Sequence, residues 1–129
     1  MGDGAWYKGG CHCGAVAFEV RLPSTARALD CTCAICRMTG FQHLIAKRDD
    51  FRLLKGQDAL TSYRFNTGEA DHLFCRHCGV KSFYVPRSHP DGYSVNLRCL
   101  DPGNRPDIIM ETFDGANWEA NIANLPGKD

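Results

Sequence analysis

Three cysteines fall within six residues of this chain, at Cys31, Cys33 and Cys36. Thiols this close in sequence can converge on one metal ion, and a zinc ion with three protein ligands keeps a fourth position open for a reacting molecule. Such a site can bind an incoming thiol, lower its pKa and hold it as a thiolate at neutral pH. The spacing therefore predicts a catalytic zinc site whose chemistry is centred on a thiol.

Two further cysteine pairs, Cys11 with Cys13 and Cys75 with Cys78, lie on either side of this cluster in sequence. Alternate residues of an extended chain face the same way, so Cys11 and Cys13 can bind one ion while His12 points away from it. The second pair forms a Cys-x-x-Cys turn, which is typical of half of a zinc ribbon site. The four thiols together predict a closed, structural zinc site, which brings the expected total to two zinc ions per chain.

Two other uses of the cysteines stay open at this point. Cys99 can complete a closed tetrahedron with the three central thiols, and both zinc sites would then be structural. It lies in an alternating, strand-like segment, however, where a buried and inert thiol is the commoner outcome. Alternatively, Cys33 and Cys36 can form a redox-active pair without a metal ion.

Composition limits the number of domains, the kinds of partner and the location that we expect for this protein. A chain of 129 residues with 43% hydrophobic residues predicts a single domain over residues 1–129. The 15 basic and 15 acidic side chains give a net charge of zero, which argues against a nucleic-acid partner. No window approaches the ~20 apolar residues that span a bilayer. The first residues lack the features of a secretory signal, so we expect a cytoplasmic protein whose cysteines bind metal rather than form disulfides.

Short strands account for most of the hydrophobic pattern. Residues 15–22 alternate strictly, with every second side chain apolar and directed to one side. The apolar side consists of Val16, Phe18, Val20 and Leu22. Further strands are expected over 26–29, 42–46, 51–55, 60–65, 70–74, 80–85, 93–98 and 108–113.

These segments predict an all-β, mainly antiparallel fold that is held together by metal and has at most one or two short helices. Residues 60–65 and 70–74 are expected to pair as a hairpin, and residues 117–123 to form a short helix. Residues 6–10 are expected to form a turn, and the central cysteines to lie on a loop at the end of a strand.

The remaining polar residues give weaker signals. Each of the scattered histidines is expected to be a surface or hydrogen-bonded residue rather than a catalytic one; they are His43, His72, His77 and His89. Three arginines lie near the cysteine-bearing segments and are candidates for binding substrate carboxylates; they are Arg37, Arg87 and Arg98.

The three cysteine motifs, taken together and in this order, resemble those of the glutathione-dependent formaldehyde-activating enzyme family, also called the centromere protein V family. The resemblance extends from about residue 7 to residue 118. It is carried by segments 10–16, 31–36 and 74–80, and by the downstream segments 83–88 and 96–101.

The resemblance implies an Mss4-like β fold with a structural zinc held by Cys11, Cys13, Cys75 and Cys78. It also implies a catalytic zinc at Cys31, Cys33 and Cys36, where glutathione adds to formaldehyde to give S-hydroxymethylglutathione. We therefore expect a carbon–sulfur lyase with a small thiol and a small aldehyde as its substrates. A non-catalytic zinc module that binds a protein partner is the alternative, and a chromatin- or RNA-associated adaptor is opposed by the zero net charge.

Overall fold

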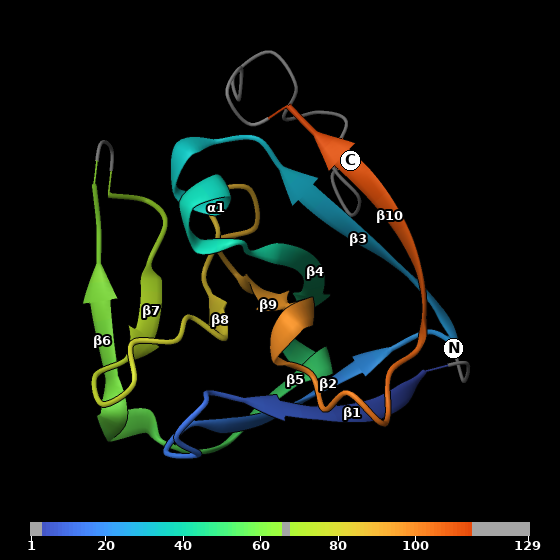
Figure 1. Ribbon diagram of the computed structural model, residues 1–129, viewed down its shortest axis with the longest axis horizontal. Helices are drawn as coiled ribbons and strands as arrows, with labels where there is room; N and C mark the ends of the chain where they lie inside the picture. The colour runs from blue at the N-terminus through green and yellow to red at the C-terminus, as the bar shows by residue number, and fades with distance from the viewer. Residues whose placement is uncertain (1–3, 66–67, 115–129) are drawn as a thin grey trace.

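Strands dominate the computed structural model, which describes residues 4–65 and 68–114. In these residues the strands form a three-stranded sheet, a five-stranded sheet and a separate two-stranded hairpin (Figure 1). The three-stranded sheet has the order β1 (Ala5–Gly10), β2 (Ala17–Leu22), β5 (Phe51–Lys55), and both pairings are antiparallel.

The five-stranded sheet carries most of the residues that matter for the site. Its strand β10 pairs in parallel with β3, and the other three pairings are antiparallel. The strand order is β10 (Asp107–Phe113), β3 (Thr25–Cys31), β4 (Gln42–Lys47), β9 (Gly92–Asn96) and β8 (Phe83–Tyr84).

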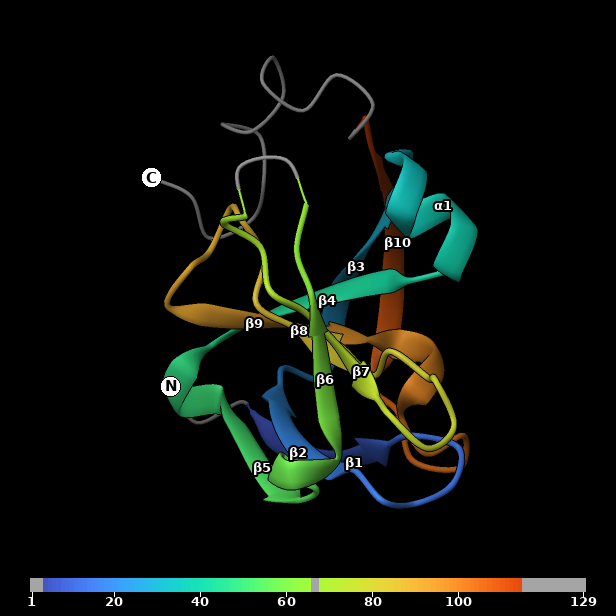
Figure 2. The ribbon, with the colours of Figure 1, turned by 90° about the vertical axis from the view of Figure 1, so that its left-hand side faces the viewer.

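The hairpin of β6 (Leu60–Tyr63) and β7 (His72–Cys75) lies beside β8, to which it is joined by a bridge between Asp71 and Val85 (Figure 2). The described residues contain one α-helix, α1, and none of their helices is long and apolar enough to cross a membrane. The helical segments are α1 (Ala34–Thr39), η1 (Arg48–Asp50), η2 (Gln57–Ala59) and η3 (Leu97–Cys99).

The expected all-β, mainly antiparallel fold is confirmed. All four apolar residues expected on one side of the 15–22 segment are buried in the core. Phe18 is fully buried there and its ring lies 5.4 Å from that of Phe51 and 5.9 Å from that of Phe83. The predicted hairpin is also present, since β6 and β7 pair antiparallel.

The expected turn over residues 6–10 is wrong, because β1 runs through Gly10 and pairs with β2 along its whole length. Gly9 and Gly10 suggested flexibility, but in the fold they permit close backbone approach. A Cβ on Gly9 would lie 2.6 Å from the Cys99 carbonyl oxygen, and one on Gly10 would overlap the Val16 carbonyl oxygen.

Four other expectations need correction or fall outside the described residues. Cys31 ends β3 and Cys33 precedes α1, as expected for a cluster at the end of a strand, but Cys36 lies within α1 rather than on a loop. The helix ends at Gly40, which is in the left-handed conformation. Cys99 lies in the 3₁₀ helix η3 rather than in a strand, and only Phe83–Tyr84 of segment 80–85 is a strand. The helix expected over 117–123 lies outside the described residues.

We expect Phe18→Ala to lower the free energy of unfolding by about 3–5 kcal/mol, because the loss of a buried aromatic ring leaves a cavity between the two sheets. Denaturant titration followed by circular dichroism measures this change. Leu54→Ala is the control, since its side chain is 51% exposed, and it should change stability by less than about 0.5 kcal/mol. A cost below about 1 kcal/mol for Phe18→Ala would contradict this account of the core.

Candidate metal sites and pocket

The structure brings four of the predicted ligands together in a first cluster. Their Sγ atoms all lie within 4.8 Å of one another, although 62 residues separate Cys13 from Cys75. Backbone N–H groups donate to two of the sulfurs, from Val16 to Cys11 at 3.3 Å and from His77 to Cys75 at 3.4 Å. The cluster consists of Cys11, Cys13, Cys75 and Cys78.

This first cluster fits a metal ion. Four thiols and no carboxylate form a donor set that suits zinc, and the N–H donors stabilise thiolates as they do in zinc-binding turns. The pKa of Cys78 is lowered to about 6 despite desolvation, because the backbone around Cys13 and Val80 donates hydrogen bonds to it. His12 is exposed and lies outside the cluster, as expected.

The second cluster is formed by Cys31, Cys33 and Cys36, whose Sγ atoms also lie within 4.8 Å of one another. Cys31 is the last residue of β3, Cys33 precedes the first turn of α1, and Cys36 is buried within that helix. Hydrogen bonds from the thiols of Cys31 and Cys36 lower the pKa of Cys33. Three converging thiols, one of which ionises readily, form a donor set that fits a metal ion with a free coordination position.

Cys99 belongs to neither cluster among the described residues. Its thiol lies 4.0 Å from the Lys81 carbonyl oxygen, and burial raises its pKa to about 11. The negative charges of Cys11 and Cys78, which belong to the first cluster, raise the pKa of Cys99 further. The geometry therefore does not support the alternative in which Cys99 closes the site of Cys31, Cys33 and Cys36.

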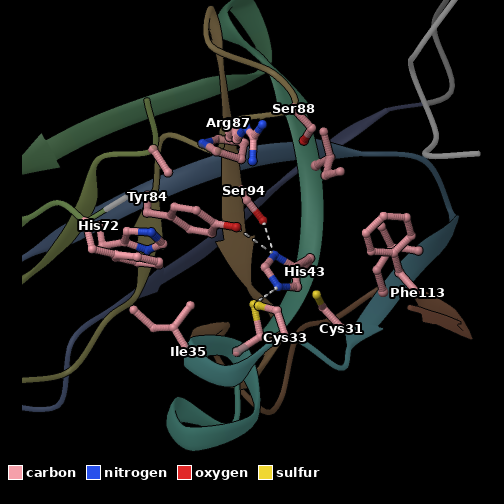
Figure 3. A pocket seen from close by; sticks show the side chains of 16 residues that line it. Cys31, Cys33, Ile35, His43, His72, Tyr84, Arg87, Ser88, Ser94 and Phe113 are labelled. Carbon is pink, nitrogen blue, oxygen red and sulfur yellow. Dashed lines mark hydrogen bonds between the residues drawn. The ribbon is translucent and has the colours of Figure 1, made fainter. Parts of the chain in front are cut away.

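A buried histidine supports the second cluster. His43 Nε2 lies 3.0 Å from Cys36 Sγ, and His43 Nδ1 lies 2.8 Å from Ser94 Oγ (Figure 3). Burial lowers the pKa of His43 to about 4, so the imidazole is neutral at pH 7. Through its two ring nitrogens, His43 connects the Cys36 thiol of α1 to the Ser94 hydroxyl of β9. The Tyr84 hydroxyl lies 3.5 Å from Nδ1 and faces the same space.

Above this cluster lies a pocket with a volume of about 210 Å³. Its wall comes from β3, α1, β4, β7, β8, β9 and β10, from the segment between β6 and β7, and from residues 86–88 after β8. Apart from the three cysteines, the lining residues are Leu29, Ile35, His43, Ile45, Phe65, Ala70, His72, Tyr84, Pro86, Arg87, Ser88, Ser94 and Phe113. Of the three candidate arginines, Arg87 lines the pocket, whereas Arg37 and Arg98 are exposed and do not.

Lys81 lies behind one wall of the pocket and is only 8% exposed. Its Nζ donates a hydrogen bond to His72 Nδ1 at 2.7 Å and lies 4.0 Å from the centre of the Tyr84 ring. His72 in turn stacks on Tyr84 with ring centres 4.8 Å apart. The lysine therefore holds His72 as the tautomer with its proton on Nε2 and fixes the plane of this wall.

Sequence reasoning did not assign His43, Tyr84 or Ser94 to the site. His43 and His72 were expected to be ordinary hydrogen-bonded or surface residues, and both are hydrogen-bonded, but they are buried in the pocket wall. A usable signal existed for His43, because a polar residue inside the apolar run of β4 must find a partner when it is buried. The same signal existed for Ser94, a buried polar residue between Tyr93 and Val95 in β9.

Comparison with known proteins identifies relatives of this chain. The family model of the glutathione-dependent formaldehyde-activating enzyme matches residues 6–115. A protein of Halomonas elongata named "Putative glutathione-dependent formaldehyde-activating enzyme" is 26% identical, with the match covering 81% of this chain and 74% of that protein. A crystal structure of a Rhodobacter sphaeroides protein has a TM-score of 0.69 and 39% identity, over 79% of this chain and 99% of that one. The chain therefore belongs to the glutathione-dependent formaldehyde-activating enzyme family.

Proposed function

We propose that this chain is a carbon–sulfur lyase that adds the thiol of glutathione to formaldehyde or a related small aldehyde, and catalyses the reverse reaction. The observation that carries the proposal is the convergence of Cys31, Cys33 and Cys36 at the floor of a pocket. A zinc ion held by these thiols would bind the incoming thiol and lower its pKa. Membership of the family supports the pairing of glutathione with formaldehyde.

In the addition, the sulfur forms a bond to the carbonyl carbon, the C=O π bond breaks, and the oxygen takes up the proton that the thiol gave up. His43 holds Cys36 in place through its Nε2, and Ser94 holds the imidazole through Nδ1. Burial raises the pKa of Tyr84 well above its ordinary value, so its hydroxyl stays protonated. That hydroxyl is available to donate a hydrogen bond to the oxygen on which negative charge develops.

The first cluster has a structural role in this proposal. Cys11, Cys13, Cys75 and Cys78 would hold a second zinc ion and join the loop after β1 to the turn after β7.

We also propose that residues 1–129 form a single domain and that the protein works in the cytoplasm, where thiols stay reduced. None of the eight cysteines forms a disulfide, which is typical of proteins in such a compartment. A non-catalytic zinc module would need no pocket above its metal ligands, so the lyase is the better candidate.

Metal analysis tests the assignment of the ligands. We expect two zinc ions per native chain, one per Cys33→Ser chain and two per Cys99→Ser chain, measured by elemental analysis after gel filtration. The Cys33→Ser chain should keep a cooperative unfolding transition, because its first cluster is intact. If Cys99→Ser loses one zinc ion, then Cys99 is a ligand and the open catalytic site is wrong.

The cation of Lys81 lies near the second cluster and has no carboxylate partner among the described residues. Desolvation lowers its pKa to about 8 from 10.5, although the negative charges of Cys36 and Cys33 oppose this shift. The unfolded chain therefore binds more protons than the folded chain between these two values. The burial of Lys81 destabilises the fold fully below about pH 8, and this penalty fades as the pH rises toward 10.5.

We expect the stability of the native protein, relative to that of Lys81→Met, to rise by up to about 3 kcal/mol between pH 8 and 10.5. Urea titrations of both zinc-loaded proteins at several pH values measure this difference. Both proteins are kept zinc-loaded so that the ligand thiols, including the Cys33 and Cys36 thiols that act on Lys81, stay ionised throughout this pH range. A difference that is independent of pH would show that Lys81 keeps its ordinary pKa in the fold.

Exchange NMR on an equilibrium mixture of glutathione and formaldehyde tests the reaction itself. We expect the zinc-loaded native protein to accelerate the interconversion of the free species and their adduct by at least tenfold. Cys33→Ser should lose that acceleration and Cys99→Ser should keep it, because Cys99 lies outside the pocket. No acceleration by the native protein, with two zinc ions confirmed, would disprove formaldehyde activation.

A further inference from the structure

The pocket is larger than formaldehyde requires. Its volume is about 210 Å³, whereas an apolar cavity of ~150 Å³ is enough to hold a benzene molecule. Formaldehyde contributes a single carbon and its oxygen, which would leave most of this space empty. A site that is shaped for the smallest aldehyde alone would not need walls that reach from β10 to the β6–β7 hairpin.

Aromatic side chains line the pocket on two sides of the cysteines. Phe113 lies on one side of Cys31, and Tyr84 and His72 lie on the other (Figure 3). His72 and Tyr84 are nearly parallel, with an interplanar angle of 12°, and Phe65 stacks on the outer face of His72 at 5.2 Å. Aromatic side chains on two sides of a pocket favour an aromatic or branched apolar guest.

Leu29, Ile35 and Ile45 complete the apolar part of the wall. The only cationic side chain among the described lining residues is that of Arg87, and its guanidinium already lies 3.0 Å from Glu69 Oε1. Glutathione carries two carboxylates and an ammonium group, and burial of these charges without partners is costly. The tripeptide must therefore extend outward from its sulfur, and the interior of the pocket is left for the group on the aldehyde carbon.

We propose that the preferred aldehyde of this site carries an apolar substituent about the size of one aromatic ring, which lies between Phe113 and Tyr84. This inference rests on the proposed function, because it names the second substrate of the same addition. The glutathione sulfur forms its bond to the aldehyde carbon, the C=O π bond breaks, and the oxygen takes up the thiol proton. The product is a hemithioacetal, and no oxidant or reductant takes part.

Exchange NMR with phenylacetaldehyde and with formaldehyde, each mixed with glutathione, tests the inference. Acceleration is measured against the protein-free mixture of the same aldehyde, so that intrinsic reactivity cancels. We expect the zinc-loaded native protein to accelerate exchange with phenylacetaldehyde at least tenfold more than exchange with formaldehyde. Phe113→Ala should reduce this preference roughly tenfold, since the loss of an apolar contact in a pocket costs about that much in discrimination.

Phe113→Leu keeps an apolar side chain and should give an intermediate preference, which guards against an unfolded alanine variant. Met110→Ala is the matched control, because its side chain lies on the same strand, is 44% exposed and does not line the pocket. Acceleration with formaldehyde alone would overturn the inference and leave the proposed function standing. A preference that is the same in native protein and in both Phe113 variants would also overturn it. No acceleration with either aldehyde would disprove the proposed function and, with it, this inference.

Discussion

Strand β4 pairs with β3 on one side and with β9 on the other, and the register of these two ladders positions the pocket. His43 lies opposite Leu29 in the first ladder and opposite Asn96 in the second. This places its ring above the end of β3, where the chain leaves the sheet as Cys31 and enters α1. A slip of one residue in β4 would turn His43 to the other face and leave Cys36 without its partner.

The same sheet explains how polar groups can be buried around the pocket. His43, Ser94, Lys81, His72 and Asn96 are all less than 9% exposed, yet each has a hydrogen-bond partner. Among the described residues no buried side-chain nitrogen or oxygen lacks a partner. Because an unpaired polar group at this depth is costly, the partners fix the side chains in one arrangement. The polar floor and aromatic walls are thus organised before a substrate binds, which is what electrostatic catalysis requires.

Local patterns predicted the fold class well and the pocket poorly, and the reason is physical. The strict alternation around Phe18 and the spacing of the cysteines express constraints between residues that are near in sequence. Strand β1 was missed because Gly9 permits a close approach to Cys99 of η3, which lies ninety residues away in the chain. Helix α1 is too short to show a period, and Gly40 was its one signal. The pocket combines His43, Tyr84 and Ser94 through ladder registers that no local pattern contains.

The two cysteine clusters differ in what a bound metal could do for the fold. A metal ion at the first cluster would close a loop of about sixty residues between Cys13 and Cys75, and the stabilisation from such a crosslink grows with loop length. A metal ion at Cys31, Cys33 and Cys36 would close a loop of only a few residues, whose ends β3 and α1 already hold together. Stability therefore accounts for the first cluster but not for the second. The second lies under a pocket and contacts His43, so its three thiols are better explained by the chemistry of a bound substrate than by the integrity of the fold.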